Sequence, residues 1–185
     1  QLAIAPQRWY DEQNIHVLTG QRVTGLDVTA RQVVCEGGLT LVYDKLIYAL
    51  GARCFVPPIP GHEQAHVIAI RSLADAKQAL ALMRQGGDAV VIGGGVLGLE
   101  AAWELKRVGM QVTVLEAAPQ IMGRQIDANA AALLAKRMEE KGIALKQGVQ
   151  IAAITDKAVT LSDGRSFPAE LVIVSAGVRA NTALA

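Results

Sequence analysis

Residues 90–100 read VVIGGGVLGLE, and this stretch decides the fold. Its glycines Gly93, Gly95 and Gly98 have the spacing G-x-G-x-x-G, after an apolar run and before an alanine-rich helical pattern. Between a strand and a helix, the first glycine permits a tight turn and the second lets the backbone approach a pyrophosphate. The third lets the helix pack closely on the strand. The stretch therefore predicts a dinucleotide site.

Two further features indicate which dinucleotide is bound. The helix that follows the glycines has free N–H groups and a partial positive charge at its start, so Val96 and Leu97 are the predicted phosphate donors. Glu116 closes the next strand, at about the 20-residue spacing of the ribose-binding acid. Its charge would repel a 2′-phosphate, so NAD(H) is favoured over NADP(H). Arg124, in the following loop, either weakens that preference or is a solvated loop charge.

Glu100 has two interpretations. It lies early in the helix, where a carboxylate is stabilised by the helix dipole, or it points toward the nicotinamide end of the cofactor. The three histidines have no carboxylate or serine partner at a meaningful spacing, so no catalytic residue is predicted.

The surrounding pattern predicts an α/β fold. Apolar strands over residues 88–93 and 110–116 alternate with helices over 72–85, 96–108 and 128–141. Short antiparallel strands over 150–167 and a buried strand, LVIVSAG, follow. This order predicts a Rossmann-like, doubly wound parallel sheet with a β-meander crossover.

The first part of the chain has a different pattern. A helix end over residues 5–13 precedes short alternating strands, which lead into an expected buried strand, KLIYAL, at 45–50. A stiff connector rich in proline ends at Gly61, and we predict a domain boundary there. The expected domains are therefore 1–61, part of an FAD-binding domain, and 62–185, an NAD(H)-binding domain.

An internal similarity supports two domains of one type. GLTLVYDKLIYALGAR at 38–53 parallels GRSFPAELVIVSAGVR at 164–179, and both end in Gly-x-Arg after a meander. Gly51 lies close to the start of the chain, so the first copy's phosphate loop is expected before Gln1. A first residue other than Met also indicates a piece of a longer protein.

Composition excludes several classes of function. The net charge is +1 and aromatic residues make up 4%, which argues against nucleic-acid binding. No apolar run is long enough to span a membrane, and no signal peptide is recognisable. The 2 cysteines have no metal-ligand spacing, so no metal site is predicted and both are interpreted as packing residues. A cytoplasmic location is expected.

The chain resembles the FAD-dependent pyridine nucleotide–disulfide oxidoreductase superfamily. Within it, the similarity is to NADH-dependent reductases such as rubredoxin reductases, NADH oxidases and the flavoproteins of assimilatory nitrite and nitrate reductases. The resemblance is carried in order by YDKLIYALGARCFVPPIPG (43–61), AVVIGGGVLGLEAAWELKRVGMQVTVLE (89–116), APQIMGRQID (118–127) and VIVSAGVR (172–179).

The resemblance implies an NAD domain inserted within an FAD domain of the same fold. It implies that Gly93, Gly95, Val96, Leu97, Gly98 and Glu116 contact NAD(H), with Glu100 and Gly177 near its nicotinamide half. In the intact protein, hydride would pass from NADH to FAD, and electrons would go on to an acceptor protein, a nitrite or nitrate reductase centre, or oxygen. A homodimer is one expectation for the intact protein.

Three positions depart from the family pattern. Leu50 stands where the family usually has Thr, which weakens any FAD contact there. Val96 stands where some relatives carry a Tyr that covers the flavin, and Ala180 replaces a common Pro. Three alternatives to the electron-transfer function stay open: a dithiol–disulfide reductase of the same superfamily, a non-catalytic NAD-sensing domain, and a chain that by itself is only a folded scaffold. The chain alone is expected to be inactive.

Overall fold

The computed structural model describes residues 4–184, which divide into two compact units. The smaller unit is Gln1–Gly51 with Asn181–Ala185, and the larger is Ala52–Ala180. The smaller unit contains the short helix α1 (Gln7–Glu12) and an antiparallel sheet of β1 (Val23–Asp27), β2 (Gln32–Cys35) and β3 (Thr40–Val42). The predicted β-meander is therefore present.

The larger unit is built on a parallel sheet of five strands in the order β5-β12-β6-β7-β8. Its strands are β5 (Val67–Ile68), β6 (Asp88–Ile92), β7 (Gln111–Glu116), β8 (Ile143–Gln147) and β12 (Leu171–Val174). The helices are α2 (Leu73–Leu82), α3 (Val96–Arg107) and α4 (Ala128–Glu140). This topology confirms the predicted α/β, Rossmann-like fold.

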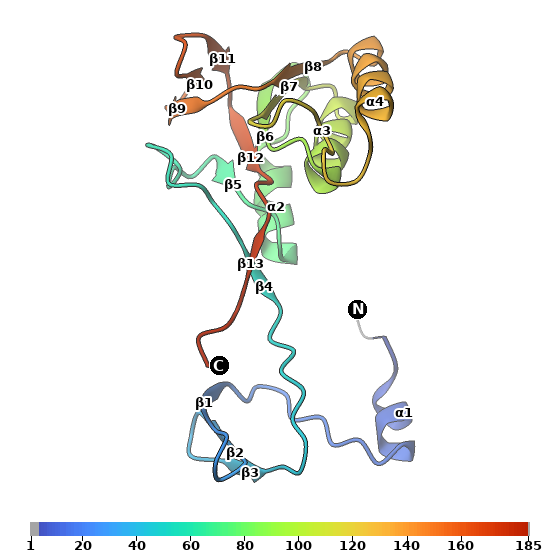
Figure 1. Cartoon of the computed structure of the whole chain (residues 1–185), viewed down its shortest axis with the longest axis vertical. Helices are drawn as coiled ribbons and strands as arrows, with labels where there is room; N and C mark the ends of the chain where they lie inside the picture. Colours follow the sequence, from blue (N-terminus) through green and yellow to red (C-terminus); the bar gives the residue numbers. More distant parts are fainter. Residues whose placement is uncertain (1–3, 185) are drawn as a thin grey trace. The chain divides into compact units, whose positions relative to one another are not determined.

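The side chains of the sheet alternate between two cores. Val91 and Val114 pack against helix residues such as Ala102 and Leu105, whereas Val90 packs with the meander. The meander consists of β9 (Ile151–Ile154), β10 (Ala158–Leu161) and β11 (Ser166–Pro168). In Figure 1 this meander and the helices α3 and α4 lie on different sides of the sheet strands. Strands buried on both faces read as continuous apolar runs, which explains the sequence of β6 and β12.

The helix starts follow from their capping residues. Ser72 and Asp75 form a capping box at α2, in which the Ser72 hydroxyl accepts from the Asp75 amide and the Asp75 carboxylate accepts from the Ser72 amide. The Asp127 carboxylate accepts from the Ala130 amide at 2.8 Å, and so begins α4. By contrast, α3 begins at Gly95 with no side-chain cap.

The expected buried strand at 45–50 is not formed. Within residues 4–184 nothing pairs with this segment, and Ile47 is 90% exposed. A strand needs a neighbouring edge for its backbone hydrogen bonds, and here only Tyr48 and Leu50 bond to Asn181. This sequence-based prediction was wrong for the chain as it stands.

Residues 52–61 pack with the larger unit, so the contacts divide the chain at Gly51 and not at the predicted Gly61. Strand β4 (Ala52–Cys54) pairs with β13 (Val178–Ala180), which places Arg53 opposite Arg179. The ends of the two similar segments at 38–53 and 164–179 therefore lie side by side. The assignment of the two regions to FAD and NAD(H) stays a proposal.

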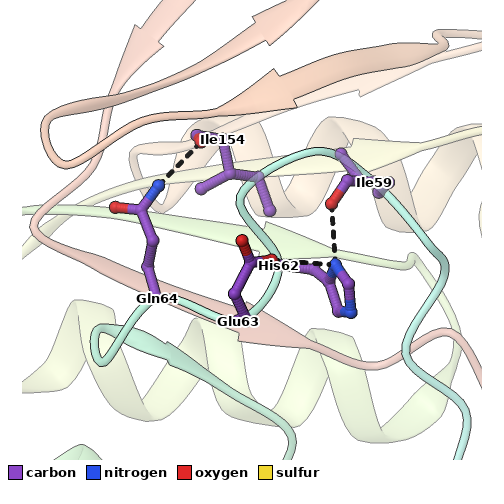
Figure 2. A network of polar contacts seen from close by, with 5 residues as sticks. All are labelled: Ile59, His62, Glu63, Gln64 and Ile154. Atoms are coloured by element: carbon purple, nitrogen blue, oxygen red, sulfur yellow. Dashed lines mark hydrogen bonds and ion pairs between the residues drawn. The ribbon is translucent and has the colours of Figure 1, made fainter.

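The connector after β4 is fixed to the meander by hydrogen bonds (Figure 2). Gln64 Nε2 donates to the Ile154 carbonyl oxygen at 2.9 Å, and the Ile154 amide donates to the Pro60 carbonyl oxygen at 2.8 Å. His62 Nδ1 donates to the Ile59 carbonyl oxygen at 2.9 Å. A Cβ at Gly61 would collide with the Ile154 carbonyl, so only glycine permits this approach. These contacts hold the connector on the larger unit.

An exposed ion pair, screened by solvent, is expected to make a small acid-sensitive contribution to the stability of the larger unit. The Arg84 guanidinium forms a two-pronged hydrogen bond with the Glu170 carboxylate, and this bond holds the pKa of Glu170 below its ordinary 4.5. A carboxylate with a lowered pKa stabilises the fold above its unfolded pKa, and that contribution is lost as the pH falls through the folded value.

Arg84→Met is therefore expected to remove part of the acid sensitivity of the larger unit. When the pH is lowered from about 7 to about 3, the thermal unfolding midpoint should fall further in wild type than in Arg84→Met. Thermal unfolding midpoints at both pH values measure this difference. An equal loss in the two proteins would contradict the role of this pair.

Candidate nucleotide-binding groove

A groove of about 1090 Å³ lies at the carboxyl ends of the parallel strands. Its lining comes from the turn after β6, the loop after β7 and the segment that follows β12. Ligands of open α/β sheets bind in this crevice, and the volume is slightly above the roughly 300–1,000 Å³ of small-molecule sites. The fold therefore places a ligand-sized groove beside the glycine-rich turn.

The three glycines have different surroundings. A Cβ at Gly93, where φ is +111°, would collide with the Ser175 carbonyl, and a Cβ at Gly98 would collide with the Gly93 carbonyl. A Cβ at Gly95 would meet nothing within 4 Å, and Gly95 lines the groove. Packing therefore requires glycine at positions 93 and 98. Gly95 instead leaves room for a ligand group to approach its backbone.

The start of α3 supplies donors to this space. Its N-cap is Gly95, and no side chain caps the helix there. The first N–H groups of a helix have no partner within the helix. Together with the partial positive charge of the helix end, they suit an anionic group. The predicted donors Val96 and Leu97 occupy the first two helical positions.

Glu116 lies directly beside the glycine-rich turn. Its Oε2 accepts a hydrogen bond from the Gly94 amide at 2.5 Å, and its Oε1 accepts one from the Ala118 amide at 2.7 Å. A carboxylate oxygen has about two lone pairs, so each oxygen keeps one for a further donor. The carboxylate is thus fixed in position and can still accept bonds from two hydroxyl groups.

Two other predicted residues lie in the same groove. Arg124 lines it from the loop after β7, and it makes no ion pair with any residue of the described range 4–184. Gly177, where φ is +97°, lines it after β12. The structure therefore brings Gly93, Gly95, Glu116, Arg124 and Gly177 to one groove.

The remaining predicted residues are placed differently. Gly98 is buried in the packing of α3, and Leu97 is 68% exposed without lining the groove. Val96 and Glu100 line a second groove of about 430 Å³ between α3 and α4, together with Trp103. Contacts of these side chains with NAD(H) stay predictions.

Sequence reasoning missed part of the groove wall. Pro57 and Ile59 come from the connector, and Val149 and Ile151 come from the segment after β8. Gln120 also lines the groove, from the loop that carries Arg124. The connector was missed because sequence reasoning assigned it to the other domain. For the segment after β8, the one available signal was the rule that ligands bind beyond the carboxyl ends of parallel strands.

No group of three or more His, Cys, Asp or Glu side chains that could hold a metal ion occurs in residues 4–184. Across the same residues, no helix has the length and apolar run needed to cross a bilayer.

Known proteins are similar to this chain in sequence and in fold. The chain is 38% identical over 180 residues to a nitrite reductase [NAD(P)H] of Bacillus subtilis, covering 95% of this chain and 22% of the relative. A ferredoxin reductase structure from Rhodopseudomonas palustris matches with a TM-score of 0.89 and 30% identity, over 97% of this chain and 46% of that one. A water-forming NADH oxidase from Lactobacillus brevis, bound to NADH, matches with a TM-score of 0.81 and 26% identity, over 89% of this chain and 38% of that one.

The chain thus spans less than half the length of each of these proteins. The family model described as pyridine nucleotide-disulphide oxidoreductase matches residues 4–185, which is nearly the whole chain. The glycine-rich turn, the fixed acid at the end of β7 and the parallel sheet all lie within that match. The chain belongs to the pyridine nucleotide-disulphide oxidoreductase family.

Proposed function

We propose that the larger unit binds NADH in the groove at the carboxyl ends of β6 and β7. The observation that carries this proposal is the position of Glu116, whose carboxylate is held against the glycine-rich turn by the amides of Gly94 and Ala118. An acid fixed in this way accepts hydrogen bonds from ribose hydroxyls. The open space at Gly95 fits a pyrophosphate at the backbone.

The residues of this chain bind and orient the nucleotide. The free N–H groups at the start of α3 would hold the pyrophosphate, and Glu116 would hold the adenosine ribose. Gly177, which leaves the groove wall without a side chain, would lie toward the nicotinamide half. When bound, NADH supplies a hydride. No side chain is assigned a proton-transfer role.

For the intact protein we propose an NAD(P)H-dependent oxidoreductase that also contains FAD. Family membership and the relatives support this proposal. The relatives differ in what receives the electrons, since they include a nitrite reductase, a ferredoxin reductase and a water-forming oxidase. The acceptor is therefore proposed only as an electron-acceptor protein or a small molecule. The homodimer and the cytoplasmic location stay predictions.

The proposal predicts a preference for NADH. A 2′-phosphate would replace a hydroxyl donor with an anion next to the Glu116 carboxylate, which would lower the affinity for NADPH. Arg124, which lines the same groove, would recover part of that affinity. We expect NADH to bind about tenfold more tightly than NADPH, a difference of about 1.4 kcal/mol. Calorimetric titration of the chain with each nucleotide measures this ratio. Equal affinities would contradict the role of Glu116.

A further inference from the structure

The loop between β7 and α4, residues 117–126, carries part of the proposed nucleotide groove. Gln120, Met122 and Arg124 all line that groove. The loop includes a non-glycine residue in the left-handed region, Met122, where φ is +50°. A side chain in that region costs about 1–2 kcal/mol. Within the loop, the Gln125 and Ile126 amides donate to the Met122 carbonyl oxygen, and contacts outside the loop add to this support.

Besides the bond from the Ala118 amide to the Glu116 carboxylate, three contacts fix the loop to neighbouring elements. The Ile121 amide donates to Gln147 Oε1 at 2.9 Å, and the Met122 amide donates to the Gly94 carbonyl oxygen at 2.9 Å. The Gly148 amide donates to the Ala118 carbonyl oxygen at 2.9 Å. Of these three contacts, only the one with Gln147 uses a side chain. It can be removed by substitution while the backbone stays intact, whereas the Glu116 carboxylate that accepts from the Ala118 amide belongs to the proposed nucleotide site.

The contact with Gln147 is made where the loop is buried. Ile121 is 0% exposed. Its Cγ2 packs so closely on Gly94 that a Cβ added there would lie only 2.7 Å from it. Without Gln147, the Ile121 amide would be left without a partner beside this packed side chain. An unsatisfied buried amide is costly, so the loop would move to expose it.

We propose that Gln147 is a positioning residue for the nucleotide groove. It lies at the end of β8, in register with Glu116 on β7, and it is outside the groove lining. By holding Ile121 it sets the position of Met122 against Gly94, and hence the positions of Gln120 and Arg124 in the groove. The nucleotide part of this inference rests on the proposed binding of NADH.

The test compares two isosteric substitutions. Gln147→Met removes the hydrogen bond to the loop and keeps the volume of the side chain. The matched control is Gln78→Met, because Gln78 also makes a hydrogen bond to a backbone group: its Nε2 donates to the Ala65 carbonyl oxygen at 3.1 Å. That bond joins α2 to the residue two positions before β5, and neither Gln78 nor Ala65 lines the groove. Both variants lose one hydrogen bond, and only one of them frees the loop.

Two readouts follow the loop and the nucleotide separately. Trypsin cleaves after the exposed Arg124, so the rate of that cleavage reports local opening of the loop. We expect Gln147→Met to be cleaved there about fivefold faster than wild type, and to bind NADH about five- to tenfold more weakly by calorimetry. Gln78→Met should match wild type in both measurements.

Each other outcome has a defined meaning. Unchanged NADH affinity in Gln147→Met overturns the positioning role, whatever the cleavage rate. An equal loss of affinity in Gln78→Met also overturns it, because the effect would then be general destabilisation. If wild type binds no NADH while cleavage at Arg124 still separates the two variants, the proposed function and the nucleotide role of Gln147 fail, but the hold of Gln147 on the loop stands.

Discussion

Gly98→Ala is expected to lower the free energy of unfolding of the larger unit by about 3 kcal/mol. A Cβ at this position would lie 3.3 Å from the Ser175 Cβ and closer than 3.0 Å to the Gly93 carbonyl oxygen. The Gly93 amide donates to the Leu115 carbonyl oxygen and the Ser175 amide donates to the Ile92 carbonyl oxygen, both at 2.8 Å. Neither neighbour can therefore move without loss of such a bond. Alanine is normally the better helix former by about 1 kcal/mol, but the collision outweighs that gain.

Thermal unfolding measures this effect, and we expect a midpoint lower by about 10 °C. Gly95→Ala is the matched control, because the same methyl group would there meet nothing within 4 Å. Its stability should stay within about 1 kcal/mol of wild type. Equal stability of Gly98→Ala and wild type would show that α3 does not pack on the glycine-rich turn as described.

Gly95→Ala is expected to weaken NADH binding about 100-fold. The added methyl group would project into the groove, where the backbone must be approached by the pyrophosphate. Loss of two charge-assisted hydrogen bonds at about 1.5 kcal/mol each gives this factor. Calorimetry on the folded variant measures it. Retention of wild-type affinity would place the nucleotide elsewhere.

The two glycine variants therefore separate folding from binding. Gly98→Ala should lose stability, and Gly95→Ala should lose nucleotide affinity, although the two residues are only three positions apart in the sequence. If both variants lost only stability, the G-x-G-x-x-G spacing would serve packing alone.

Local sequence signals were sufficient to predict the core of the larger unit. The helix predicted at 96–108 is α3 at Val96–Arg107, and the helix predicted at 128–141 is α4 at Ala128–Glu140. These elements carry their own start and stop residues, such as Asp127 and Gly109, and their apolar faces repeat with the helical period. The glycine-rich turn could be predicted for the same reason, because it lies between two such elements.

Other features depend on contacts between distant parts of the chain. The hydrogen bond from Ile121 to Gln147 and the left-handed conformation of Met122 have no local sequence signal. Pro57 and Ile59 line the groove because the connector returns to the meander at Ile154. The segment 45–50 has the pattern of a strand, but pattern alone cannot supply the neighbouring edge that a strand requires.

The most direct test of the proposed NADH site is an NMR titration that follows backbone amide signals. We predict that NADH shifts the amides of Gly94–Leu97 and Glu116–Ala118, and leaves the indole signal of Trp103 in the groove between α3 and α4 unchanged. Shifts confined to Trp103 and its neighbours in that second groove, or no shifts at saturating NADH, would contradict the account.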